Sequence, residues 1–180
     1  MIELLPEEHF TNKSVVLGLG NLLYGDEGFG IHAMQMLHDH LGSTDGLEFV
    51  DGGVLGLNLL PLVESCCHLL LLDAIDAGKP PGTVIELEKD KIPLLSGVKL
   101  SEHQLGFQEV LALASLRENL QDHLHLVGVQ PSSLSTGVGL SPEVTAGLSE
   151  VIQKAGEVLQ IWGLIEYSRQ NEKNEVVRPG

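Results

Sequence analysis

Apolar runs and helical periodicities alternate along most of this chain. Short apolar runs that end in glycine or a polar residue predict buried strands, here at residues 15–20, 47–51, 68–73 and 125–129. Segments with apolar residues at helical spacing predict helices, here at residues 28–41, 57–65, 101–119 and 142–162. This alternation is typical of a parallel α/β sheet with helices packed on it.

One predicted strand departs from this rhythm. Residues 83–88, TVIELE, alternate apolar and polar side chains as a half-exposed strand does. The preceding stretch, AGKPPG at 77–82, has no room for a helix, and a parallel return needs a crossover of about a dozen residues or more. We therefore expect residues 83–88 to form an antiparallel edge strand in a mixed sheet.

The starts of the last two predicted helices carry capping signals. Ser101 is followed three residues later by Gln104, a capping-box pattern that places His103 in the first helical turn. Ser141 supplies an N-cap for the last helix, and the proline and acid that follow it suit a first turn.

Length and composition indicate one globular domain. The 180 residues, 43% of them hydrophobic, are enough to bury a full core. We assign residues 1–166 to a single α/β domain and the polar residues 167–180 to a flexible tail. The longest apolar stretch is broken by His68 and Asp73, and it is shorter than the roughly 20 residues of a membrane span.

Charge and cysteine content exclude several classes of partner and compartment. A net charge of −15 with only ten basic residues argues against nucleic-acid binding. Cys66 and Cys67 are adjacent, which is a poor arrangement for a structural disulfide, and the first ten residues lack the pattern of a secretion signal. We expect a reduced, cytoplasmic protein without a membrane span.

The first predicted strand runs into a glycine-rich turn that ends on two carboxylates. After Gly18 and Gly20, a dinucleotide-binding fingerprint requires a third glycine where this chain has Leu23. The turn also lacks the Gly-Lys-Ser/Thr ending of a P-loop, and Asp26 and Glu27 would repel a phosphate. A cation suits this turn better than a nucleotide does.

Three polar residues stand where side chains of an α/β protein can converge on a ligand. Glu27 follows the first strand, Asp73 ends the third, and His103 opens a helix. Ligands in open α/β sheets bind outside the carboxyl ends of the strands, where the strand order reverses, and we expect strands one and three to flank that crevice. Two carboxylates and one imidazole suit zinc or nickel with one coordination position open.

Each of these residues also has a structural interpretation that spacing alone leaves open. Glu27 can interact with a helix dipole, Asp73 can cap a turn, and His103 can be a solvated first-turn residue. Asp76 is an alternative ligand or a plain loop carboxylate, and Asp51 with its two following glycines forms either a tight turn or a place where a peptide approaches closely. Six further histidines match no metal-binding motif, and most of them are expected to be structural or solvated: His32, His38, His40, His68, His123 and His125.

Five ordered blocks between Val15 and Trp162 carry a family resemblance: GLGNLLYGDEGFG, VDGG, LLLLDAIDAGKPPGT, LSEHQLGF and LVGVQP. Together they resemble the hydrogenase maturation endopeptidases. The resemblance implies a three-layer α/β/α fold around a twisted, mostly parallel five-stranded mixed sheet with one antiparallel edge strand. It also implies that Glu27, Asp73 and His103 form the metal-binding and catalytic site.

The implied substrate is the precursor of a [NiFe] hydrogenase large subunit, whose C-terminal extension is removed after nickel insertion. Nickel presented by that precursor would be the recognition signal, and a surrogate divalent ion such as zinc or cadmium would fit the same ligands. The main alternative is a non-catalytic nickel-sensing chaperone or binding module for the precursor. A small-molecule hydrolase or nucleotide-binding protein is the third interpretation, because this fold class hosts many chemistries.

Overall fold

The computed structural model describes residues 12–92 and 102–166, with the side chains of residues 102–106 outside the description. Five strands form one sheet: β1 (Ser14–Leu19), β2 (Leu47–Gly53), β3 (His68–Ala74), β4 (Val84–Glu88) and β5 (His123–Val129). Their order across the sheet is β2-β1-β3-β5-β4. Helices lie on both faces of this sheet: α1 (Phe29–Leu41), α2 (Leu60–Ser65), α3 (Glu102–Leu116) and α4 (Pro142–Ile161).

The sheet has the mixed character that the sequence predicts. β2, β1, β3 and β5 are parallel, and β4 pairs with β5 in the antiparallel sense at the edge. The chain steps from β1 outward to β2 and then back past β1 to β3, so the strand order reverses between β1 and β3. The topological switch point therefore lies between β1 and β3, as predicted.

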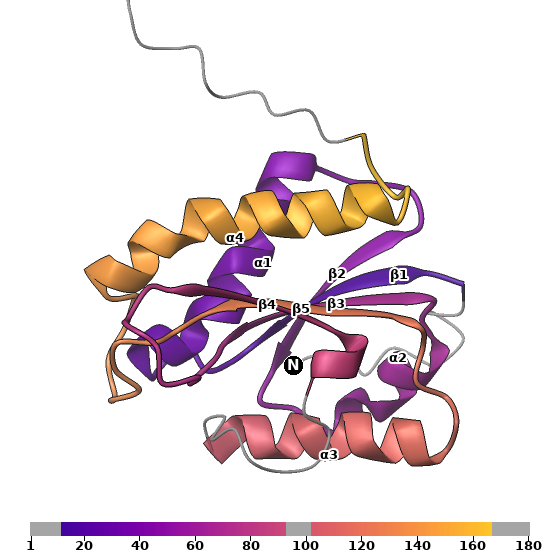
Figure 1. Cartoon of the computed structure of the whole chain (residues 1–180), viewed down its shortest axis with the longest axis horizontal. Coiled ribbons are helices and arrows are strands. Elements are labelled where there is room, and N and C mark those ends of the chain that lie inside the picture. Colours follow the sequence, from indigo (N-terminus) through magenta and orange to yellow (C-terminus); the bar gives the residue numbers. More distant parts are fainter. Residues whose placement is uncertain (1–11, 93–101, 167–180) are drawn as a thin grey trace, which may run out of the picture.

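Two hydrophobic clusters hold the layers together, one on each face of the sheet. Figure 1 shows α1 and α4 covering one face and α2 and α3 covering the other. Leu69 and Leu71 of β3 pack toward the α2–α3 face, whereas Leu70 and Leu72 pack toward the α1–α4 face. The run of four leucines is explained by this burial on both sides of a central strand.

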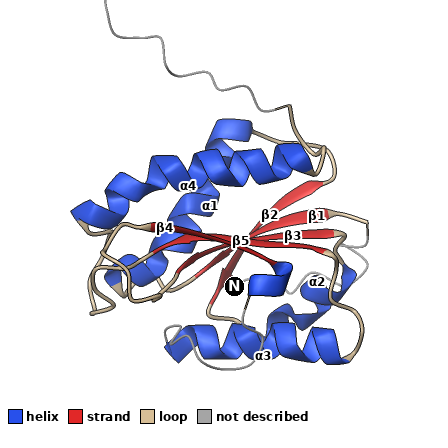
Figure 2. Ribbon diagram, viewed as in Figure 1, coloured by secondary structure: helices blue, strands red, loops and turns tan. Residues whose placement is uncertain are grey.

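The predicted element boundaries need small corrections. The helix expected at 57–65 consists of the short 3-10 helix η3 (Gly56–Leu59) followed by α2, with Pro61 near the start of α2, where its missing N–H costs no helical hydrogen bond. A second 3-10 turn, η2 (Gly25–Gly28), precedes α1. Figure 2 shows α1 and α2 on opposite faces of the sheet.

Among the described residues, every helix is too short or too polar to cross a membrane. Ser141 caps α4 as predicted, accepting a hydrogen bond from the Val144 N–H. The predicted cap at position 101 and the tail at 167–180 lie outside the described residues.

Candidate active site

The turn after β1 buries Glu27 at the carboxyl edge of the sheet. Glu27 lies in η2, and only 4% of its surface is exposed. Its N–H donates to the Tyr24 carbonyl at 3.1 Å, and its carbonyl accepts from the Asn21 N–H at 3.2 Å. These two hydrogen bonds fix the backbone of Glu27 relative to the end of β1.

Glycines in this turn allow backbone contacts that a side chain would block. A Cβ on Gly20, whose φ is +127°, would lie 1.8 Å from the Glu27 carbonyl oxygen. A Cβ on Gly30 would lie 2.0 Å from the Leu72 carbonyl oxygen and 2.4 Å from that of Leu19. The first turn of α1 therefore sits directly on the ends of β1 and β3, and η2 contacts β3 as well.

Asp73 occupies the end of β3, beside this turn. Its side chain is 5% exposed, and its Oδ1 accepts a hydrogen bond of 2.8 Å from the Ala74 N–H. β3 pairs with β1 from Ser14–His68 to Gly18–Leu72, so Asp73 follows directly after the last paired position. The structure thus places Glu27 and Asp73 on adjacent elements at the switch point, as the sequence predicts.

The third predicted residue, His103, lies in the first turn of α3, which begins at Glu102. Its side chain is outside the described residues, so its part in the ligand set stays a prediction. Among the described side chains, no group of three His, Cys, Asp or Glu residues is arranged to hold a metal ion. A full ligand set at this site would therefore need a group such as His103 or one supplied by a substrate.

A family model described as hydrogenase maturation protease, HycI, matches residues 31–158. The match includes Asp73 and His103 and begins after Glu27. The chain belongs to the hydrogenase maturation protease family. It is accordingly a peptide hydrolase.

Individual relatives span most of the chain. It is 40% identical over 167 residues to the hydrogenase expression/formation protein HupD of Thiocapsa roseopersicina, covering 92% of this chain and 75% of that protein. It is 34% identical to the hydrogenase 2 maturation protease of Escherichia coli, covering 88% and 97% of the two chains. The solved structure of the hydrogenase maturating endopeptidase HybD from E. coli superposes with a TM-score of 0.78 at 34% identity, over 84% of this chain and 94% of that one.

Asp26, the neighbour of Glu27, has a structural role in this protease that the sequence did not reveal. It is 1% exposed and accepts four hydrogen bonds of 2.6 to 3.1 Å from the connection between β5 and α4. The donors are the N–H groups of Ser132, Ser133 and Ser141 and the Ser141 hydroxyl. A buried carboxylate with four donors is well satisfied, and it ties the Glu27 turn to a loop more than a hundred residues away in sequence.

Gln130, directly after β5, holds the loop after β3 through side-chain hydrogen bonds. Its Oε1 accepts from the Ala77 and Lys79 N–H groups at 2.9 and 3.0 Å, and its Nε2 donates to Asp76 at 3.0 Å. Asp76 is thus a loop carboxylate in the structure. Asp51 likewise accepts the Gly53 N–H at 3.0 Å, which supports the tight-turn interpretation of that motif.

The buried cysteine, Cys66, offers no activated nucleophile. Burial raises the pKa of the Cys66 thiol to about 12, so the reactive thiolate is scarce at neutral pH. Gln121 donates a 2.7 Å hydrogen bond to its sulfur. Cys67 is exposed. The N–H groups of Ser132 and Ser133 donate hydrogen bonds to Asp26. Neither serine lies in the Gly-x-Ser-x-Gly motif of a nucleophilic serine.

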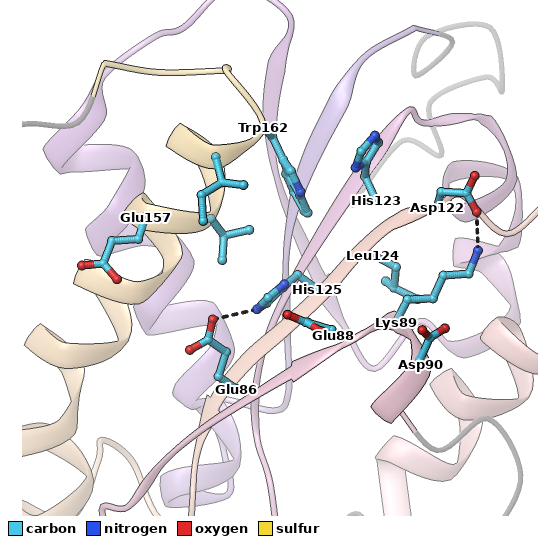
Figure 3. A pocket seen from close by; sticks show the side chains of 12 residues that line it. Glu86, Glu88, Lys89, Asp90, Asp122, His123, Leu124, His125, Glu157 and Trp162 are labelled. Atoms are coloured by element: carbon cyan, nitrogen blue, oxygen red, sulfur yellow. Dashed lines mark hydrogen bonds and ion pairs between the residues drawn. The ribbon is translucent and has the colours of Figure 1, made fainter.

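A pocket of about 540 Å³ opens at the opposite edge of the sheet, around the first residues of β5 (Figure 3). β5 runs from this pocket toward the Glu27 edge, roughly 20 Å for a strand of this length. His125 Nε2 lies 2.9 Å from Glu86 Oε1, and Lys154 Nζ lies 2.8 Å from the other oxygen of the same carboxylate. The pocket is therefore separate from the predicted active site.

Beside this pocket, the imidazole rings of His68 and His123 are stacked. The His68 and His123 rings are 4.5 Å apart, Trp162 covers His68 at 5.2 Å, and Ser14 Oγ shares a 2.9 Å hydrogen bond with His68 Nδ1. Burial, and then the charge of His123, lowers the pKa of His68 below its ordinary value. The folded state thus favours neutral His68.

We expect this stack to make the free energy of unfolding fall as the pH drops below about 6.5, because His68 then takes up a proton more readily in the unfolded chain. Below the lowered folded-state pKa, the loss should level off. Urea unfolding at pH 7.5 and 5.5 should show a smaller pH difference for His68→Gln than for the unaltered protein. His32→Gln, on α1 outside the stack, is the control and should retain the difference; an unchanged pH difference in His68→Gln would contradict the account.

Proposed function

We propose that this protease removes the C-terminal extension of a [NiFe] hydrogenase large-subunit precursor after nickel insertion. The observation that carries the proposal is the burial of two carboxylates, Glu27 and Asp73, at the topological switch point. Family membership adds peptide hydrolysis in hydrogenase maturation. It therefore favours a peptidase over a non-catalytic chaperone or binding module for the precursor.

The nickel of the precursor is the proposed recognition signal. Two carboxylates and an imidazole are a donor set that suits nickel, and it suits zinc or cadmium as surrogate ions. In this proposal Glu27, Asp73 and His103 engage the nickel that the precursor presents. A bound divalent ion supplies Lewis-acid polarisation of a carbonyl or water.

The roles of the protein groups follow from their positions. Burial of Glu27 and Asp73 removes water from around both carboxylates, which strengthens their interaction with a cation. The Ala74 N–H holds one oxygen of Asp73, and the backbone of the η2 turn positions Glu27. His103 lies in the first turn of α3, and the proposal takes its imidazole as the third ligand.

Nickel-gated cleavage is the expected result when the purified protease is incubated with nickel-loaded and nickel-free precursor. Without nickel, the three ligands have no cation through which to position the scissile peptide. Intact-mass spectrometry should show loss of a C-terminal peptide from the nickel-loaded precursor alone.

Two outcomes would count against the proposal in different ways. Equal cleavage of the nickel-free precursor would remove nickel as the signal and leave the peptidase activity. No cleavage of a correctly folded nickel-loaded precursor would remove the proposed substrate.

A further inference from the structure

Exposed large apolar side chains gather at the carboxyl edge of the sheet. Of the nine such residues among the described part of the chain, six lie on the connections that follow β1, β2 and β5 at this edge. We call these six the apolar rim: Leu22, Leu23, Tyr24, Val54, Leu57 and Val138. The other three, Met36, Leu116 and Ile161, are on helices.

The rim is formed by three loops that are bonded to one another. The loop after β1 carries Leu22, Leu23 and Tyr24, and it lies between the other two. On one side the Gly20 N–H donates to the Gly53 carbonyl at 3.1 Å, next to Val54. On the other side the Gly137 N–H donates to the Leu23 carbonyl at 2.9 Å, next to Val138.

These loops are free of charge in a strongly charged protein. The chain has 25 acidic and ten basic residues, yet residues 14–25, 52–63 and 126–142 contain no Asp, Glu, Lys or Arg. A charged peptide segment placed on the rim would lose hydration without meeting an opposite charge there. The rim therefore suits an uncharged, apolar partner segment.

Further hydrogen bonds hold the loop after β1 against the loop after β5. Asp26, directly after this loop, accepts four hydrogen bonds from residues 132–141, and Gly25 donates to the Gly137 carbonyl at 2.8 Å. A surface that is already ordered loses less entropy when it binds. Exposed apolar patches of this kind mark interaction sites.

We propose that the apolar rim binds an uncharged, apolar segment of the precursor that flanks the scissile bond. This inference rests on the proposed function, because it takes the precursor as substrate. The rim is continuous with the predicted active site, since Tyr24 and Glu27 belong to the same turn and the Tyr24 carbonyl accepts the Glu27 N–H. A segment held on the rim would extend past Glu27, and rim contacts would set substrate affinity.

Aspartate substitutions test the apolar rim at its two most exposed positions. Leu23 is 64% and Val138 is 91% exposed, so Leu23→Asp and Val138→Asp should leave the fold intact. The matched controls are Leu116→Asp and Ile161→Asp, at helix ends with exposures of 82% and 81%. Thermal melts followed by circular dichroism check the fold of all four variants, and Val138→Asp suffices if Leu23→Asp fails to fold.

The readouts are the Kd for nickel-loaded precursor and the KM of processing, both measured with Glu27 intact. Biolayer interferometry gives the Kd from early association and dissociation, before cleavage proceeds. Each rim variant should weaken binding about tenfold or more and raise KM with little change in kcat. The controls should stay within about twofold of the unaltered protein.

Each other outcome would overturn the rim inference, the proposed function or both. Normal binding and KM in the rim variants, with normal cleavage by the unaltered protease, would overturn the rim and leave the proposed function standing. Rim variants that change only the sedimentation of the protease would show a contact between copies of this chain, which also overturns the inference. Failure of the unaltered protease to bind the precursor would overturn both, whereas rim-dependent binding without cleavage would overturn the function alone.

Discussion

Glu27→Gln is expected to lower the rate of precursor processing by about 10²- to 10⁴-fold, the usual contribution of one acid–base group. Glutamine has nearly the shape of glutamate, so the η2 turn and its backbone hydrogen bonds are preserved. The substitution removes the negative charge that would face nickel or a reacting proton at a position only 4% exposed. Single-turnover cleavage of nickel-loaded precursor, followed by intact mass, measures the effect.

Glu143→Gln is the matched control for this experiment. Glu143 is an exposed acid in the first turn of α4, and its substitution should change processing by less than about twofold. Thermal melts should show that the Glu27→Gln variant is folded. Wild-type cleavage by such a folded variant would remove Glu27 from the proposed mechanism.

Gly30→Ala should destabilise the fold by more than about 3 kcal/mol, because the new methyl group would overlap backbone on both central strands. Its Cβ would lie 2.0 Å from the Leu72 carbonyl oxygen and 2.4 Å from the Leu19 carbonyl oxygen. Neither carbonyl can rotate away as a side chain can, so α1 would have to move off the sheet. Helix propensity alone would favour alanine by about 1 kcal/mol. A lower free energy of unfolding in Gly30→Ala would therefore indicate the backbone overlap and not helix propensity.

Urea unfolding measures this loss, with Gly137→Ala as the control. A Cβ on Gly137 would meet nothing nearer than the Ser135 carbonyl oxygen at 3.9 Å, so its substitution should change the free energy of unfolding by about 0.5 kcal/mol or less. A Gly30→Ala protein with an unchanged unfolding midpoint would show that α1 is not held against β1 and β3 as described.

Much of the fold follows from local pattern. The leucine run of β3 and the apolar run of β1 indicate strands buried on both faces, and AGKPPG before β4 leaves too few residues for a parallel crossover. The same local logic places Glu27 and Asp73, because Glu27 lies in the turn after one recognisable strand, Asp73 lies near the end of another, and parallel strands share one carboxyl edge. His103 was predicted from a capping pattern, and α3 does begin at Glu102.

The features that the sequence left unpredicted depend on contacts between distant segments. In the sequence, Asp26 is one of two adjacent acidic residues. Its hydrogen-bond donors lie on the loop before α4, 106 to 115 residues further along the chain. Gln130 belongs to the LVGVQP block, but nothing in that block indicates hydrogen bonds to the loop after β3, which form only because β3 and β5 pair in register. The stack of His68, His123 and Trp162 likewise joins two strand starts and a helix end.

By itself, the sequence determined the succession of strands and helices along the chain, the mixed sheet and the two carboxylates near strand ends. These depend on periodicity and on chemistry within a few neighbouring residues. The tertiary structure alone decided that Asp26 and Gln130 are structural, and that three uncharged loops join into one apolar rim beside Glu27. Strand order and register set which loops meet in space, and no local pattern encodes them.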